Sequence, residues 1–223
     1  MEIFASSIPI DIDTSYFSGL FPLLSPEKKT SIKSFSNRED ALRSLTGEWL
    51  ARKVISAKLN IPLEKIVIAA DAKGKPVLLG GEIHFNISHS GRWVVLVVDE
   101  RPAGIDVEQI RQMDVDLLID SVFTEEEKKY ILSGSGKDKT YRFFEMWTLK
   151  ESLMKAIGEG LTLPLKDYAI IKDNDKIKLF SKDTNQYYFK QYYIGVDYVL
   201  AVCAKAETFP DNISFIHCKG YKT

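Results

Sequence analysis

The chain has 223 residues, of which 45% are hydrophobic and 27% are charged, and its formal net charge is −1. This length suits one large domain or two small ones, and the composition is ordinary for a globular protein. A net charge near zero provides no overall basic field, so we expect no nucleic-acid partner.

The sequence pattern also predicts neither a membrane span nor a secreted protein. No apolar run approaches the roughly 20 residues that a spanning helix needs, and the first residues lack the basic and apolar regions of a signal peptide. Cys203 and Cys218 do not form a CxxC pair, which favours reduced thiols. We therefore expect a cytoplasmic protein without a membrane partner.

The first half is predicted to begin with a strand at residues 2–12. Ser25 and Pro26 suit the N-cap and the first position of a helix, and a long amphipathic helix then runs to about Leu59. Alternating hydrophobicity and turn residues predict strands in the rest of this half. These strands cover residues 66–69, 77–79, 83–88 and 93–98.

The second half is predicted to begin with a strand at residues 104–109. Helices are expected at residues 115–122, after the capping box of Thr124 and Glu127, and at residues 138–157. Four strands of an antiparallel sheet follow. They cover residues 168–171, 176–180, 187–192 and 198–204.

The two halves have a similar pattern. Residues 84–98 can be laid over residues 188–202, and a long helix precedes the strands in each half. Two strands of similar composition can match by chance, but the order of helix and strands recurs as well. We therefore predict an α+β pseudo-dimer of two similar halves, residues 1–102 and 103–223, with the active site at the interface between them.

One face of the predicted helix at residues 138–157 carries an aromatic ring, a carboxylate and an ammonium group. Trp147, Glu151 and Lys155 are four residues apart, so they lie one above the other, and Lys150 stands beside the carboxylate. A Glu–Lys pair at this spacing is also common on surface helices, where it contributes about 0.3 kcal/mol. We hypothesise that Glu151 instead meets a second acidic pair around a metal ion.

That second pair is Asp106 and Glu108, two residues apart on a predicted strand. Their side chains point to the same face, where two carboxylates repel each other unless a cation intervenes. Together with Glu151 they form an all-oxygen donor set, which suits Mg²⁺ or Mn²⁺. The sequence has no Cys/His cluster for zinc. The alternative is that the pair lies on the solvated face of an edge strand.

Several basic and polar residues fit a phosphorylated ligand. Lys75 lies in a Gly-Lys-Pro turn, Lys28 and Arg43 lie on early helices, and Ser88 and His89 end a strand. Around three carboxylates these cations predict a site for a magnesium-bound polyphosphate, although many helical lysines are merely solvated. The markers of Rossmann dehydrogenases, P-loop NTPases, serine hydrolases and zinc proteases are not found in the sequence.

Four motifs in chain order resemble those of the surfactin-type 4′-phosphopantetheinyl transferases. They are Gly74–Pro76, Phe85–Gly91, Gly104–Glu108 and Trp147–Lys155. The resemblance extends from the region of Ser25 to Cys203, which is nearly the whole chain. It implies a pseudo-dimer of two α+β halves that transfers the phosphopantetheine arm of coenzyme A to a serine of an apo carrier protein. It also implies Mg²⁺ as the metal and 3′,5′-ADP as the by-product.

The resemblance implies a role for each matching residue. Asp106, Glu108 and Glu151 would bind the metal, and Lys150 and Lys155 would contact the phosphates in transfer. Glu127 would help to activate the acceptor serine through water and is the better candidate for the base, whereas Glu151 would be foremost a metal ligand that could also accept the proton. The residues implied to bind coenzyme A are Lys28, Arg43, Ser44, Lys75, Pro76, Ser88, His89 and Lys155. Residues 111–123 would receive a carrier protein of nonribosomal peptide or polyketide synthesis.

The sequence departs from the family pattern at Ser31, where relatives often carry a basic residue. One contact to the 3′-phosphate of coenzyme A is therefore open, and Lys33 could supply it only if the helix turns that side chain inward. We expect a monomer, because both halves of the site lie in one chain. The alternative function is a catalytically silent pseudo-dimer that binds coenzyme A or a carrier protein without turnover.

Overall fold

The computed structural model describes the whole chain except residues 9–11, 174–175, 182–185, 220 and 222–223, and it also leaves the side chain of residue 161 undescribed. The chain folds into two compact units: Met1–Glu100 with Pro210–Thr223, and Arg101–Phe209. The boundary near residue 101 is close to the predicted one. The prediction differs at the C-terminus, because residues 210–223 were assigned to the second half and fold with the first.

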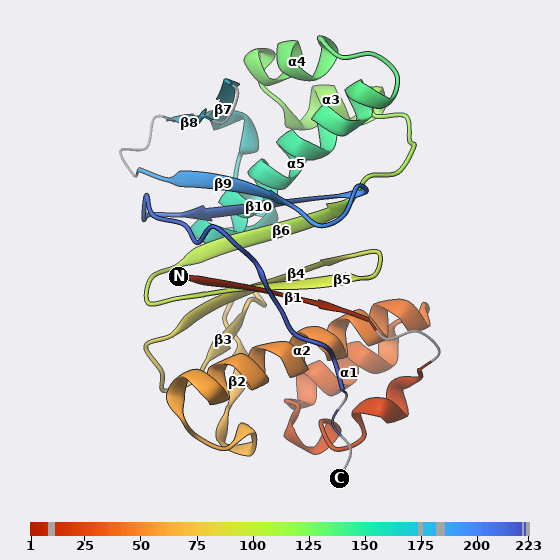
Figure 1. Cartoon of the computed structure of the whole chain (residues 1–223), viewed down its shortest axis with the longest axis vertical. Coiled ribbons are helices and arrows are strands. Elements are labelled where there is room, and N and C mark those ends of the chain that lie inside the picture. The colour runs from red at the N-terminus through yellow and green to blue at the C-terminus, as the bar shows by residue number, and fades with distance from the viewer. Residues whose placement is uncertain (9–11, 174–175, 182–185, 220, 222–223) are drawn as a thin grey trace. The chain divides into compact units, whose positions relative to one another are not determined.

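The first unit is a four-stranded sheet with its long helix against it. The sheet order is β11-β1-β5-β4, and every pair is antiparallel except β1 with β11. Helix α2 packs against β5 and β4 (Figure 1). The elements are β1 (Glu2–Ser7), α1 (Pro26–Ser34), α2 (Arg38–Leu59), β2 (Ile68–Ala70), β3 (Pro76–Leu78), β4 (His84–Ser90), β5 (Trp93–Asp99) and β11 (Ser214–Phe215).

The second unit has a three-stranded antiparallel sheet, β6-β10-β9, and a separate hairpin of β7 and β8. Helix α5 packs against β6 and β10. The elements are β6 (Ala103–Gln109), α3 (Asp116–Val122), α4 (Glu125–Leu132), α5 (Lys137–Ile157), β7 (Tyr168–Asp173), β8 (Lys176–Ser181), β9 (Tyr188–Tyr193) and β10 (Tyr198–Ala204).

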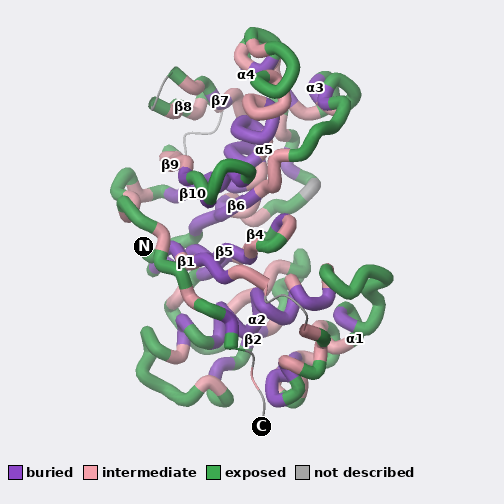
Figure 2. The backbone as a smooth tube through the Cα atoms, turned by 45° about the vertical axis from the view of Figure 1, so that its right-hand side comes forward, coloured by how far each residue is buried: buried purple, intermediate pink, exposed green. Residues whose placement is uncertain are grey.

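Short 3₁₀ helices occupy several connections. They are η1 (Thr14–Phe17), η2 (Phe21–Leu23), η3 (Leu63–Lys65), η4 (Gly160–Thr162) and η5 (Leu165–Asp167). Burial concentrates on the long helices and the central strands, and the loops are mostly exposed (Figure 2). Among the residues that the structure describes, no helix is both long and apolar enough to cross a membrane.

The predicted α+β fold of two similar halves is confirmed. Each unit contains a strand, a long helix, a small hairpin and a strand pair, and β1-β5-β4 has the same order as β6-β10-β9. The predicted alignment of residues 84–98 with 188–202 needs one change. In β4–β5 His84 pairs with Asp99, whereas in β9–β10 Tyr188 pairs with Ala204. The turn between β9 and β10 is therefore longer than the turn between β4 and β5. A single alignment offset then matches only one strand of each hairpin.

Two predicted helix starts have the expected caps. The Ser25 hydroxyl accepts a hydrogen bond from the backbone N–H of Lys28, with Pro26 in the first turn of α1. Thr124 and Glu127 form the predicted capping box at the start of α4. The first strand is shorter than expected, since β1 ends at Ser7, and part of the predicted range lies in residues 9–11, outside the described residues.

Candidate active site

The second unit brings strand β6 and helix α5 into direct backbone contact. Gly104 makes this possible, because a Cβ atom there would lie 2.0 Å from the carbonyl oxygen of Ser152 and 2.4 Å from the amide nitrogen of Ala156. No L side chain fits such a gap. This close approach places the charged candidate site residues of α5 next to those of β6. Sequence reasoning gave Gly104 no such role, although a glycine just before an acidic pair in a strand is a usable signal.

Asp106 and Lys155 join the two elements. The Nζ atom of Lys155 lies 2.7 Å from Oδ1 of Asp106, and the aspartate is only 3% exposed. This contact joins the strand and the helix through a pair that was not predicted from the sequence, because Lys155 was expected to contact phosphates. It also shows that the Asp106 carboxylate is already neutralised by an internal cation.

Glu151 belongs to the same cluster. Burial raises the pKa of Glu151, the negative charges of Asp106 and Glu108 also raise it, and Lys155 lowers it, so that together they bring this pKa to about 7. Three carboxylates and one ammonium therefore influence one another electrostatically within this unit. Among the described residues, no group of three or more His, Cys, Asp or Glu side chains is already arranged to hold a metal ion. The meeting of Asp106, Glu108 and Glu151 around a metal thus stays a prediction.

Lys150 and Glu127 have a different environment from the one predicted. Their side chains are 1% and 0% exposed, and Lys150 Nζ lies 2.9 Å from Oε2 of Glu127. Glu127 also accepts hydrogen bonds from the backbone N–H groups of Thr124 and Ile170, both at 2.8 Å. With its oxygens occupied inside the protein, Glu127 is not positioned to take a proton from a substrate, and Lys150 is not positioned to contact phosphates. We therefore correct both predicted roles.

Trp147 was predicted to share a face with Glu151 and Lys155. The structure stacks its ring on Phe143, with ring centres 5.9 Å apart and an angle of 17° between the planes. The side chain packs against the apolar core of the second unit. Its role in this structure is therefore to anchor α5 within that core.

The first unit contains a small cavity of about 210 Å³ next to α1. Lys28, Ser31, Glu48 and Pro76 contribute to its wall, so three residues named from the sequence lie together. Burial lowers the pKa of Lys28, and the nearby charge of Glu48 partly offsets this effect. Glu48 was not identified from the sequence. The only indication of Glu48 in the sequence is that it is a polar residue on the buried face of a long helix.

Lys75 lies in a turn that is held by a single carboxylate. Oδ1 of Asp71 accepts hydrogen bonds from the backbone N–H groups of Lys73 and Lys75, at 2.8 and 2.9 Å. Gly74 has φ +83°, which suits glycine in this tight turn. The turn fixes the backbone from which the Lys75 side chain projects.

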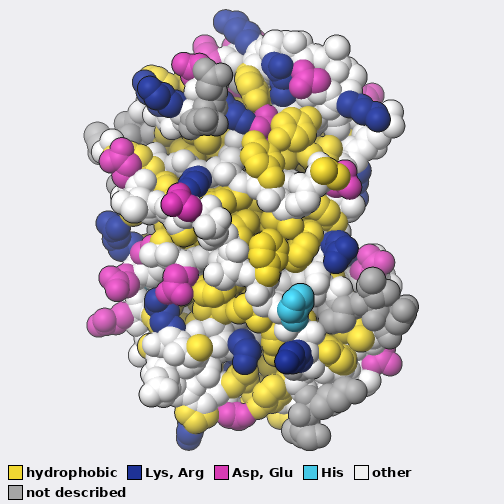
Figure 3. Space-filling model, viewed as in Figure 1, with side chains coloured by type: hydrophobic (Ala, Val, Ile, Leu, Met, Phe, Trp, Pro, Cys, Tyr) yellow, Lys and Arg dark blue, Asp and Glu magenta, His cyan; other side chains and the backbone are white. Residues whose placement is uncertain are grey.

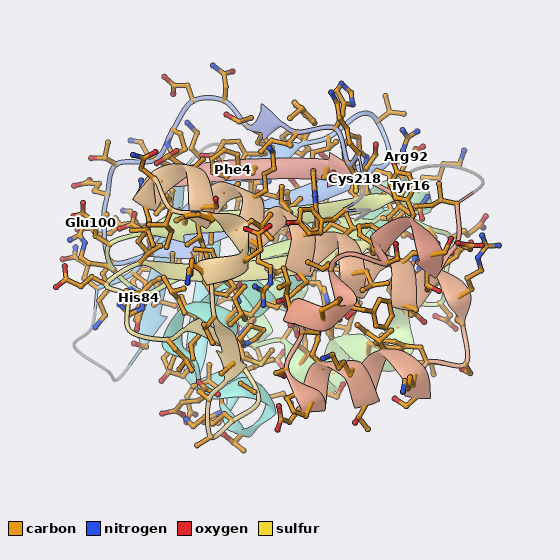
Figure 4. All side chains as sticks on the ribbon, turned by 90° about the horizontal axis from the view of Figure 1, so that it is seen from below. Phe4, Tyr16, His84, Arg92, Glu100 and Cys218 are labelled. Carbon is orange, nitrogen blue, oxygen red and sulfur yellow. The ribbon has the colours of Figure 1, made fainter. Side chains whose placement is uncertain are left out.

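Arg43 ties α2 to the turn between β4 and β5. Its guanidinium lies 2.6 Å from Asp40 and donates a hydrogen bond to the carbonyl of Gly91 at 2.9 Å. Ser44 is buried beside it, whereas Ser88 and His89 point to opposite faces of β4, one buried and one exposed. Figure 4 shows His84 and Arg92 at opposite ends of this hairpin, so His84 lies away from that turn.

The segment predicted to receive a carrier protein borders a surface hollow of about 610 Å³. Arg111, Met113 and Lys137 contribute to its wall, and Lys139 there pairs with Asp116 at 2.7 Å. Leu117 on α3 is 79% exposed. On the face that Figure 3 shows, acidic and basic side chains are interspersed.

Comparison with known sequences identifies the family. Residues 102–203 match the 4′-phosphopantetheinyl transferase superfamily, and residues 12–101 match the N-terminal region of a 4′-phosphopantetheinyl transferase. The transferase gsp of Aneurinibacillus migulanus is 36% identical over 186 residues, covering 83% of this chain and 78% of the relative. Sfp of Bacillus subtilis (strain 168) is 33% identical over 196 residues, covering 86% and 87%.

A third relative extends over almost the full length. The 4′-phosphopantetheinyl transferase psf-1 of Bacillus pumilus is 31% identical over 226 aligned residues, covering 99% of this chain and 97% of the relative. These identities extend across both units and confirm the family resemblance of the four sequence motifs. The chain therefore belongs to the 4′-phosphopantetheinyl transferase superfamily.

Proposed function

We propose that this chain transfers the 4′-phosphopantetheine arm of coenzyme A to a serine of an apo carrier protein. The hydroxyl oxygen of the serine attacks the β-phosphorus of the pyrophosphate, the bond from that phosphorus to the bridging oxygen breaks, and 3′,5′-ADP leaves. The serine proton passes to a base. The observation that carries the proposal is the cluster of Asp106, Glu108, Glu151 and Lys155 in a chain whose relatives bear this enzyme name.

We infer that Asp106, Glu108 and Glu151 hold Mg²⁺, or Mn²⁺ in its place. The donor set fits, because all three ligands are carboxylates and their mutual repulsion contributes to the raised pKa of Glu151. A bound cation relieves that repulsion. When bound, the metal neutralises charge on the pyrophosphate oxygens.

Lys155 is proposed to supply the second positive charge at this site. Its Nζ atom already reaches the carboxylate cluster, so it can contact a phosphate that approaches the same carboxylates. Of the two carboxylates considered as proton acceptor, Glu151 belongs to this cluster and Glu127 does not. The proton of the acceptor serine is therefore assigned to Glu151 or to water beside it.

The nucleotide end of coenzyme A is assigned to the first unit. The cavity beside Lys28 and Pro76 has the size of a small planar group, and Lys28 offers a largely desolvated cation there. Arg43, Ser44, Lys75, Ser88 and His89 are proposed to contact the phosphates. Ser31 supplies a hydroxyl to the cavity wall instead of a charge.

The carrier protein is assigned to residues 111–123. The hollow beside them combines basic side chains with the exposed side chain of Met113, and Leu117 of α3 is exposed in the same segment, which suits a partner with an acidic and apolar helix face. We propose carriers of nonribosomal peptide or polyketide synthesis, as used in antibiotic production. We further propose that the chain acts as a monomer in the cytoplasm, where its two buried, unbridged cysteines stay reduced.

The test is to incubate the chain with coenzyme A, Mg²⁺ and a panel of apo carrier proteins, and to weigh each carrier intact. A gain of one phosphopantetheine arm on the acceptor serine supports the proposal, and a carrier with that serine replaced by alanine is the control. Coenzyme A binding without any mass gain across the panel would favour the silent binding protein instead.

A further inference from the structure

A buried cation occupies the corresponding position of the long helix in each half. When Trp49 of α2 is matched to Trp147 of α5, Arg52 falls on Lys150. Both side chains are 1% exposed, and each is paired with a carboxylate. Burying a charge costs free energy unless the charge is fully paired. The groups that surround each cation therefore indicate its role.

Arg52 ties three parts of the first unit together. Its Nε atom lies 2.8 Å from Oε1 of Glu48, and its guanidinium donates hydrogen bonds to the carbonyls of Leu23, at 2.8 Å, and Ile66. Ile66 precedes strand β2, in the connection that follows α2. The arginine therefore fastens this connection to the helix.

Lys150 does the same in the second unit. Its Nζ atom donates to the carbonyls of Leu165 and Tyr168, both at 2.7 Å, and pairs with Glu127 at 2.9 Å. These three acceptors match the three protons of an ammonium group. Leu165 lies in η5, within the connection between α5 and β7, and Tyr168 is the first residue of β7. Glu127 binds the backbone of Ile170 on β7 as well, so the pair joins α4, α5 and β7.

The first unit has this arrangement without the metal-binding carboxylates. Matched strands and helices place Phe4, Ser6 and Lys53 where the second unit has Asp106, Glu108 and Glu151. Arg52 is buried in a unit that lacks this acidic cluster. A buried cation at this position of the helix therefore has a structural role. We propose that Lys150 and Glu127 are a positioning pair, which fixes the rotation of α5 and thereby holds Glu151 and Lys155 against β6.

The test is a double-mutant cycle of Glu127→Gln and Lys150→Met. Glu127→Gln leaves a buried ammonium without its counter-charge, so we expect the thermal midpoint to fall by roughly 10 °C. The turnover number for carrier modification should fall roughly 100-fold, and the Mg²⁺ concentration for half-maximal rate should rise. Glu126→Gln, on an exposed neighbour in α4, is the matched control and should leave all three quantities unchanged.

The double variant decides between positioning and catalysis. Removing both charges leaves no uncompensated ion. We therefore expect the thermal midpoint and the Mg²⁺ concentration for half-maximal rate to return most of the way to their wild-type values. Turnover should recover to within roughly tenfold of wild type. Lys150→Met alone should lower turnover with the KM for coenzyme A unchanged. Restored stability and Mg²⁺ requirement without restored turnover would overturn the proposal, as would a raised KM in Lys150→Met.

The transfer readouts rest on the proposed function, whereas the thermal cycle does not. If wild-type protein modifies no carrier, the proposed function fails, and the midpoints of the four proteins still report the pairing of Lys150 and Glu127. Additive midpoint losses would then overturn the positioning pair by themselves.

Discussion

Gly104 is the residue on which the geometry of the carboxylate cluster most depends. The substitution Gly104→Ala adds a Cβ atom 2.0 Å from the carbonyl oxygen of Ser152, whereas ordinary contact begins at 3.4 Å. The helix must therefore retreat from β6 by about 1.4 Å, because the obstacle is helix backbone and cannot rotate away. Overpacking usually costs 1–3 kcal/mol, and we expect about 3 kcal/mol here, or a midpoint roughly 10 °C lower.

The same displacement should separate Glu151 and Lys155 from Asp106 and Glu108. A misplacement of this size costs on the order of 100-fold in rate, so Gly104→Ala should lose about that much turnover and require more Mg²⁺. Thermal unfolding and Mg²⁺ titrations of carrier modification measure both effects.

Gly47→Ala in the first unit is the matched control for Gly104→Ala. The new Cβ atom would meet side-chain atoms and no backbone, with Cγ2 of Ile87 at 3.1 Å and Cγ1 of Val94 at 3.6 Å, and alanine favours a helix over glycine by about 1 kcal/mol. We therefore expect Gly47→Ala to be near neutral. If Gly104→Ala kept the wild-type midpoint and Mg²⁺ requirement, the proposed close contact between β6 and α5 would be wrong.

Three further predictions concern the charges of the two candidate binding regions. Because burial and neighbouring carboxylates raise the pKa of Glu151 from 4.5 to about 7, the folded metal-free protein binds a proton that the unfolded chain has released. Its stability should fall by about 3 kcal/mol as pH rises from 4.5 to 7. Glu151→Gln or saturating Mg²⁺ should remove this slope in thermal unfolding, and an unchanged slope in Glu151→Gln would refute the assignment. Lys155→Met leaves the carboxylates without their internal cation, so added Mg²⁺ should raise its midpoint more than that of wild type, while turnover falls on the order of 100-fold. Ser31→Lys adds a cation at the cavity of Lys28, so calorimetry should show coenzyme A binding up to roughly fivefold tighter, and no gain would place the 3′-phosphate elsewhere.

Much of the fold could be predicted from local pattern. The caps at Ser25 and Thr124 depend on side chains within three residues, so the sequence indicates them directly. Strand β11 could not be foreseen, because two residues carry no periodicity and their partner is β1 at the other end of the chain. The recurrence of helix and strands was visible because each half repeats its own hydrophobic pattern.

The candidate site was harder to predict where neighbouring residues have opposite environments. Lys150 and Glu151 are adjacent in sequence, yet a helix turns by about 100° between them, so one is buried and the other joins the carboxylate cluster. The sequence does not tell which face is covered by β7 and α4. For the same reason Glu127 could be recognised as a capping residue but not as the buried partner of Lys150.

The comparison of the two halves separates what the fold requires from what the chemistry requires. Both halves keep a long helix against an antiparallel sheet, and both bury a cation that fastens the connection after that helix. Only the second half replaces an apolar and a small residue of its first strand by Asp106 and Glu108. Like charges on one strand face destabilise it unless a cation is present, so the fold alone gives no reason to keep them. Their presence in the half that also has Glu151 and Lys155 agrees with the proposed binding of a cation and the anionic substrate that accompanies it.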